Sequence, residues 1–126
     1  MKHKQSLCVI SLCLILIGSA FVEVGAFDTR DLEKLNATGM CKSCNLIRAN
    51  LAGVNLSDGK LIRVNLRKAD LTGTNLSRSN LSGAYLREAN LTNANLSKAD
   101  LTGAILTGAV FCATTMPDGT TNNSGC

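Results

Sequence analysis

The chain has 126 residues, enough for one small domain, and it carries a formal net charge of +4. Aromatic residues make up only 3% of the sequence, so the side chains on which nucleic-acid bases stack are nearly absent. Together with the modest positive charge, this composition argues against direct binding of nucleic acid.

The first 26 residues have the pattern of a secretory signal peptide. Lys2 and Lys4 give a basic start, residues 7–17 are apolar apart from one serine, and small residues follow. We predict cleavage after Ala26, with Ala20 as the alternative site. A membrane anchor is the competing interpretation, but the apolar stretch is shorter than the roughly 20 residues that span a bilayer. We therefore expect export, with no stable membrane insertion after cleavage.

Cleavage would change the charge and the set of reactive side chains. It would remove Lys2, Lys4 and Glu23, which leaves 11 basic and eight acidic residues and a formal charge of +3. It would also remove His3, the one histidine of the chain. Four cysteines would remain, and an even number of cysteines in an exported chain indicates disulfides.

Residues 27–43 contain a predicted short helix over residues 29–37. Asp28 or Thr29 can cap its N-terminus, and Gly39 can end it. Leu32 and Leu35 fall on one face of this helix. We interpret the segment as a cover for the N-terminal end of the region that follows.

A large apolar residue then returns every five positions from residue 46 to residue 111. Leucine takes 13 of these places and Phe111 the last one. A small or medium residue, most often alanine, stands two positions earlier, and Asn or Asp usually stands directly before the leucine. Five is neither the helix period of 3.6 nor the strand period of 2, so the pattern predicts a solenoid whose units stack to bury their apolar faces. We expect Asn, Asp and Gly to supply the geometry of the bends.

This pattern resembles the pentapeptide-repeat family. Residues 86–96, LREANLTNANL, read almost as its consensus, and the resemblance covers residues 44–113. It implies an all-β fold, a right-handed quadrilateral β-helix with four repeats per coil. Residues 20 apart would then lie above one another. The flanking segments around Cys41 and Cys44, and from Phe111 to Cys126, look like those of exported members from the cyanobacterial periplasm and thylakoid lumen.

Both ends of such a β-helix need a cover, because an unpaired backbone edge invites aggregation. We expect residues 27–43 to cover one end and residues 114–126 to cover the other. Cys112 and Cys126 are expected to pair and to fold this tail across the last coil, a closure that would contribute about 3 kcal/mol. The predicted divisions are therefore 1–26, 27–43, 44–113 and 114–126.

Cys41 and Cys44 form a Cys-x-x-Cys motif. A redox role requires an exposed thiol with a low pKa. Cys44 takes an inward-facing place of the repeat, so we predict a structural disulfide or buried thiol pair, with thiol–disulfide exchange as the alternative. One zinc site for all four cysteines is excluded on this fold, because Cys44 and Cys112 would be about 16 Å apart along the axis.

The carboxylates suggest no catalytic site. Asp70 and Asp100 stand where Asn otherwise precedes the leucine, and we interpret them as caps of the local backbone. Asp58 and Glu88 are the other acidic residues of the repeat. Without a histidine or a cluster of carboxylates, we predict no enzyme activity, no cofactor and no metal.

One surface is less ordinary. Stacking at 20 residues would put basic residues above one another, and would put Tyr85 and Ile105 in a column that holds asparagine in earlier coils. Solvated charges, with some cover for the tail, are one interpretation, and a docking surface for a protein or an anionic surface is the other. The candidate surface comprises Arg48, Arg67, Lys68, Tyr85, Arg87, Ile105 and Val110.

These observations favour a non-catalytic exported structural or protein-interaction module. Its partner would be a protein rather than nucleic acid, and a monomer and a dimer both stay open. The resemblance also implies an alternative, because some family members imitate DNA and bind type II topoisomerases. A charge of +3 and an export signal oppose that role. The expected compartment is the periplasm or thylakoid lumen, with secretion also open.

Overall fold

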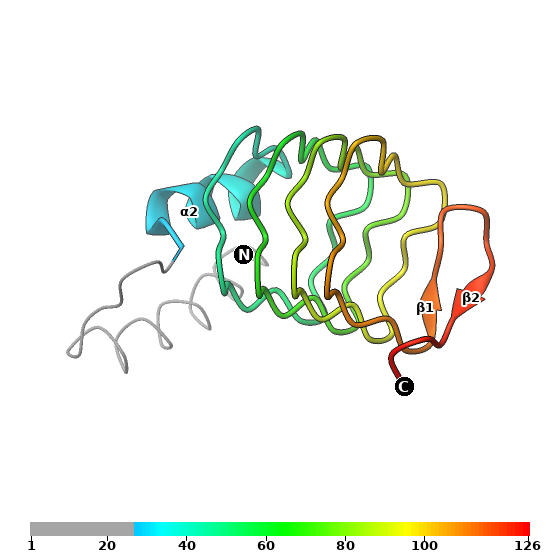
Figure 1. Cartoon of the computed structure of the whole chain (residues 1–126). Coiled ribbons are helices and arrows are strands. Elements are labelled where there is room, and N and C mark those ends of the chain that lie inside the picture. The colour runs from blue at the N-terminus through cyan, green and yellow to red at the C-terminus, as the bar shows by residue number, and fades with distance from the viewer. Residues whose placement is uncertain (1–26) are drawn as a thin grey trace.

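The computed structural model describes residues 27–126, and the signal peptide predicted for residues 1–26 lies outside the described residues. The described chain winds into a solenoid. Helix α2 (Thr29–Thr38) lies at its N-terminal end, and the strands β1 (Thr114–Thr115) and β2 (Thr121–Asn122) lie at its C-terminal end (Figure 1).

Parallel β-bridges join residues that are 20 positions apart, so four five-residue units complete one coil. The first bridge joins Met40 to Lys60 and the last joins Asn95 to Thr115. The stacking therefore begins before the predicted start at Cys44. Cys41 occupies the place of a leucine and is fully buried. Because this first unit has cysteine where the others have leucine, the leucine pattern did not indicate it.

The interior is filled by one large and one small residue from each unit. The leucines from Leu46 to Leu96 have at most 4% of their surface exposed. Thr74 and Thr114 take the small-residue place and satisfy their buried hydroxyls by donating to the carbonyls of Leu51 and Leu91, both at 2.7 Å. Near the C-terminal end the large residues are only partly buried.

Several bends use glycine, as the sequence suggested, but most of the Asn and Asp residues have another role. The residue two positions after the leucine takes the left-handed conformation, and it is often a charged residue, such as Arg48 (φ 62°), Lys68 (φ 59°) or Glu88 (φ 61°). The Asn or Asp before the leucine instead accepts a hydrogen bond from the amide two positions further on. Asn80 Oδ1, for example, accepts from Ser82 N at 3.0 Å. The side-chain bond stabilises the turn without requiring its own residue to have a positive φ.

Helix α2 lies against the first coil and is one residue longer than the predicted range of 29–37. The Asp28 side chain accepts from Arg30 N at 2.9 Å, and Gly39 ends the helix with φ 67°. Leu32 and Leu35 are each 1% exposed. The apolar face of α2 is thus packed into the core of the described chain.

The C-terminal tail turns back along the last coil. β1 and β2 pair antiparallel, with Thr114 opposite Asn122 and Thr115 opposite Thr121. Gly125 N donates to Phe111 O at 2.7 Å, and Cys112 is bonded to Cys126 with an S–S distance of 2.04 Å. The tail therefore runs beside the last coil as far as Phe111.

Candidate functional site

The candidate surface lies on one side of the solenoid and on the corner next to it. Parallel bridges place Asn45, Asn65, Tyr85 and Ile105 in one column, with asparagine in the first two coils and apolar residues in the last two. Tyr85 is 43% exposed and Ile105 is 44% exposed. Val110 is 37% exposed but belongs to the next side, where it stacks on Asn90.

The four basic residues of the candidate surface occupy the corner between these two sides. Arg48 N donates to Arg67 O at 2.9 Å, and Lys68 N donates to Arg87 O at 3.0 Å, so successive coils hold them in register. All four residues are exposed. The backbone, rather than side-chain packing, therefore fixes where these charges project.

Glu88 changes the charge of this corner. Its carboxylate lies 3.6 Å from Lys68 Nζ and 3.6 Å from Arg87 Nε. Within residues 27–126, neither Arg48 nor Arg67 has a carboxylate within ion-pair distance. The corner thus keeps a net positive charge, concentrated toward its N-terminal part.

A fifth basic residue, which the predicted surface did not include, lies on the opposite corner of the same side. Arg63 occupies the turn position one coil before Gly83, and a Cβ atom on Gly83 would lie 3.2 Å from Arg63 Cγ. The Arg63 side chain therefore lies over Gly83, which is two residues before Tyr85 in the sequence. The 20-residue period alone could have found this, because residues 43, 63, 83 and 103 share one corner.

The other carboxylates have structural partners. Asp58 accepts two hydrogen bonds from Arg78, at 2.8 and 2.7 Å, and these bonds hold the pKa of Asp58 below its usual range. The Thr102 side chain and backbone similarly lower the pKa of Asp100. Asp70 accepts from Thr72 N at 3.0 Å, which agrees with the predicted capping role.

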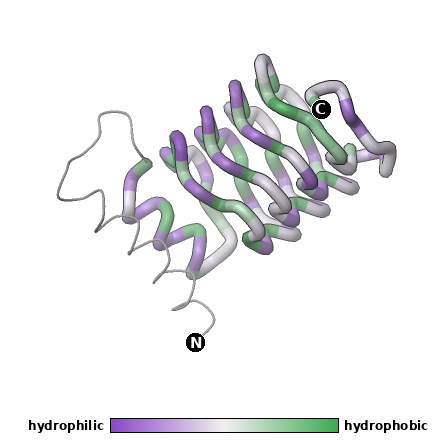
Figure 2. Tube along the Cα trace, turned by 90° about the horizontal axis from the view of Figure 1, so that it is seen from below, coloured by the Kyte–Doolittle hydropathy of each residue, from purple (hydrophilic) through white to green (hydrophobic). Residues whose placement is uncertain are grey.

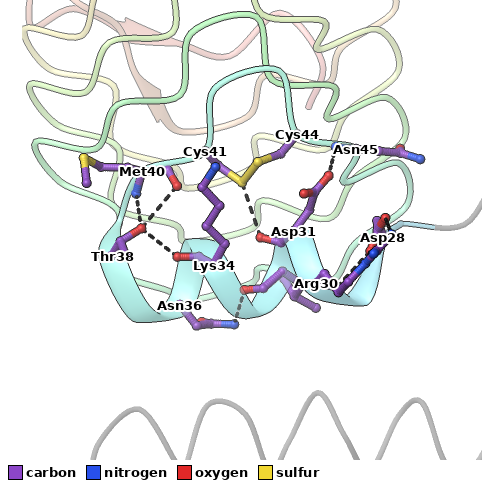
Figure 3. Close-up of a disulfide and its surroundings, with 11 residues drawn as sticks. Asp28, Arg30, Asp31, Lys34, Asn36, Thr38, Met40, Cys41, Cys44 and Asn45 are labelled. Carbon is purple, nitrogen blue, oxygen red and sulfur yellow. Dashed lines mark hydrogen bonds and ion pairs between the residues drawn. A yellow bond between two sulfur atoms is a disulfide. The ribbon is translucent and has the colours of Figure 1, made fainter.

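The Cys-x-x-Cys motif is a disulfide beneath helix α2 (Figure 3). Cys41 is fully buried and Cys44 is 3% exposed. Asp31, on the same helix, accepts from Asn45 N at 2.7 Å and ties the helix to the first coil beside the disulfide. Disulfide exchange needs a thiolate to reach a sulfur atom, and α2 stands in its way.

No three His, Cys, Asp or Glu side chains of residues 27–126 lie close enough together to hold a metal ion. Over the same residues, no helix has the length and apolar character needed to cross a membrane.

A family model described as pentapeptide repeats matches the chain in eight copies, over residues 44–83, 69–108 and 79–116. These ranges together cover more than half of the sequence. No curated protein gives a significant match.

Three pentapeptide repeat proteins are among the solved structures that are similar to the chain. A pentapeptide repeat protein of the Arabidopsis thaliana thylakoid lumen is 31% identical, with a TM-score of 0.53 and coverage of 62% of this chain and 48% of that chain. One from the cyanobacterium Cyanothece is 36% identical, with a TM-score of 0.50 and coverage of 56% and 52%. HetL, a pentapeptide repeat protein involved in heterocyst differentiation regulation in the cyanobacterium Nostoc, is 41% identical, with a TM-score of 0.44 and coverage of 66% and 36%. The chain thus spans about half of the first two proteins and about a third of HetL.

Proposed function

We propose, because the chain belongs to the pentapeptide repeat family, that it is a non-catalytic interaction module exported from the cytoplasm. Its docking face is the side that carries Tyr85, with the basic residues of its two corners. Its partner is a protein with an acidic surface. The fold is a right-handed quadrilateral β-helix, with α2 as the N-terminal cap and the disulfide-closed tail as the C-terminal cap.

One observation carries the proposal, the combination of exposed Tyr85 with unpaired basic residues on either side of it. Tyr and Arg are the residues most often responsible for affinity in protein interfaces, because they combine a large contact area with polar groups. Arg67 lies on one corner without a carboxylate partner in the described chain, and Arg63 lies on the other. An acidic partner would pair with these guanidinium groups while an apolar group covers Tyr85.

The opposite part of the surface supports this choice by contrast. There Arg78 and Asp58 neutralise each other through two short hydrogen bonds. Lys98 is exposed on the same corner and has no ion pair within residues 27–126, but no exposed aromatic side chain lies beside it.

Export is supported by the signal-peptide pattern of residues 1–26, which lie outside the described residues. It is also supported by two disulfides in the rest of the chain, since disulfides persist in oxidising compartments. The similar protein of the thylakoid lumen agrees with this assignment. We therefore place the mature chain, residues 27–126, in the periplasm or thylakoid lumen.

The two alternatives have less support. A mimic of DNA needs a strongly acidic surface, whereas the mature chain has a charge of +3. Thiol–disulfide exchange at Cys41 needs access that the α2 helix blocks. Both remain testable with a topoisomerase inhibition assay and a dithiol oxidation assay.

The proposal is tested by reversing charges on the docking face. Arg67→Glu with Arg87→Glu should abolish capture of the partner from an extract of the producing cells, because two attractive contacts become repulsive. Capture is followed by chemical crosslinking in intact cells, with identification by mass spectrometry.

The matched control is Lys60→Glu with Lys98→Glu, which makes the same change in net charge at two exposed residues outside the docking face. This variant should capture the same partner as the wild type. If both double variants lost the partner equally, binding would depend on the net charge of the protein and not on the docking face, which would contradict the proposal. If neither lost it, the docking face would be elsewhere.

A further inference from the structure

The two ends of the solenoid are covered to different extents. At the N-terminal end, α2 packs its apolar face on the first coil. At the C-terminal end, the tail runs antiparallel beside the last coil only from Thr115 back to Phe111. Residues 101–109 remain uncovered by the tail, and we call this segment the open edge.

Backbone groups that are paired in earlier coils have no such partner on the open edge. One coil earlier, Leu86 N donates to Ile105 O and Ile105 N donates to Ala84 O, both at 2.8 Å. The equivalent groups of the last coil point away from the solenoid, and no backbone bond of this kind is made by them within residues 27–126. Within residues 101–109, these groups are the N–H of Leu101, Gly103, Leu106 and Gly108 and the C=O of Ala104 and Ala109.

The open edge also lacks the charges that usually protect such an edge. Residues 101–116 contain no charged side chain, whereas every earlier coil has several. Ile105 and Val110 are exposed, and Leu101, Leu106 and Phe111 are only partly buried. Figure 2 shows the hydrophobic colouring that continues along the last coil. An unpaired, uncharged and apolar edge is a template for pairing with another strand.

We propose that the open edge is an interface between two copies of this chain, paired antiparallel about a two-fold axis at Ile105. Around a pair of residues that are not hydrogen-bonded to each other, antiparallel strands exchange bonds between the residues on either side. With Ile105 opposite its counterpart, Leu106 N–H of each copy meets Ala104 C=O of the other. The same register places Leu101 N–H opposite Ala109 C=O.

A second copy suits this edge because four of its six unpaired groups are arranged symmetrically about Ile105. A two-fold interface uses the same patch on both subunits, so a donor pairs with an acceptor at the mirrored position in the sequence. Residues 101 and 109, and residues 104 and 106, provide such donor–acceptor pairs, whereas the N–H groups of Gly103 and Gly108 lie at the bends and would bond to water. The absence of charge also lets two positively charged molecules meet without like charges in contact. The contact would bury Ile105 and leave Arg67 and Arg87 exposed.

Sedimentation equilibrium over a range of concentrations tests the interface. The wild type should be dimeric at micromolar concentration, and Ile105→Lys should be monomeric because it sets two ammonium groups face to face. Tyr85→Lys is the matched control, with the same change in the same column but one coil earlier, and it should stay dimeric. Circular dichroism shows whether both variants remain folded.

A cysteine at the proposed axis gives a second, positive test. Antiparallel pairs of this kind bring their Cα atoms to about 4.5 Å, within the range of a disulfide. Ile105→Cys should therefore form a covalent dimer on mild oxidation, and Tyr85→Cys should not. A wild type that is monomeric up to millimolar concentration would overturn the proposal and leave the edge to a strand of a different protein. A dimer that survives Ile105→Lys and gives no crosslink at Ile105→Cys would overturn it as well.

Discussion

At the scale of single residues, the leucines hold the coils together because each one touches its equivalents in neighbouring coils. Leu86 is fully buried between the coils of Leu66 and Leu106, and all three belong to one column. Leu106 has the same place in its unit, but the next coil is missing above it and its side chain is only partly buried. Leu86 and Leu106 thus occupy the same place in their units but differ in how deeply their side chains are buried.

This difference predicts unequal costs of truncation. Leu86→Ala should lower the free energy of unfolding by about 2–5 kcal/mol, because it leaves a cavity in a packed interior. Leu106→Ala should cost clearly less, since the site is already open on one side. Urea unfolding followed by circular dichroism measures both values. Equal losses would mean that the end of the solenoid is covered in solution, as a dimer at the open edge would cover it, so the comparison should use the monomeric Ile105→Lys background.

At the scale of elements, α2 acts as a lid on the Cys41–Cys44 disulfide. Leu32 and Leu35 anchor the helix, and the bond from Asn45 N to Asp31 fixes its position over the first coil. The Cys112–Cys126 disulfide has no helix above it, and Cys126 is exposed. Burial rather than bond chemistry distinguishes the two disulfides.

We therefore expect dithiothreitol to reduce Cys112–Cys126 before Cys41–Cys44. Leu35→Ala should speed reduction of Cys41–Cys44, because it weakens the packing of the lid, whereas the exposed Lys34→Ala on the same helix should not. Alkylation at successive times, with peptide mass spectrometry, measures both rates. Similar rates for the two disulfides in the wild type would contradict the assignment of α2 as a lid.

At the scale of the whole molecule, charge and burial divide the chain along its axis. Basic residues gather on the first coils, the last coil is uncharged, and both disulfides lie near the ends. The proposed docking face and the proposed dimer interface meet at Ile105, which stacks on Tyr85, but Arg67 and Arg87 lie on earlier coils. A partner and a second copy would then bind at the same time without competing for Arg67 or Arg87.

Export makes a prediction about the whole chain. The protein from its producing cells should have the mass of residues 27–126 less four hydrogens, because the leader is removed and two disulfides form. Intact mass spectrometry with and without alkylation measures this directly. Cleavage after Ala20 would keep the compartment and move the boundary. A full-length chain with reduced cysteines would contradict export.

Much of the fold was determined by the sequence, because the five-residue pattern has few physical solutions. One small and one large apolar residue in every five must both face inward, and only a stacked solenoid buries them all. The pattern therefore predicted the buried leucines. The family resemblance, with four repeats per coil, implied the bridges between residues 20 apart and the column of Tyr85 and Ile105. The helix with Leu32 and Leu35 on its buried face was also predicted from local signals.

Other features were decided only by the tertiary structure, since they depend on where side chains and backbone groups from different coils meet. The pattern did not indicate that Glu88 reaches both Lys68 and Arg87, or that Arg63 lies over Gly83. It also assigned the bends to Asn, Asp and Gly together, whereas the left-handed residue two places after the leucine is glycine at five bends and often a charged residue at the others. The extent of the tail had the largest consequence. Its length in residues says nothing of where it stops along the last coil, and that position determines which backbone groups remain unpaired.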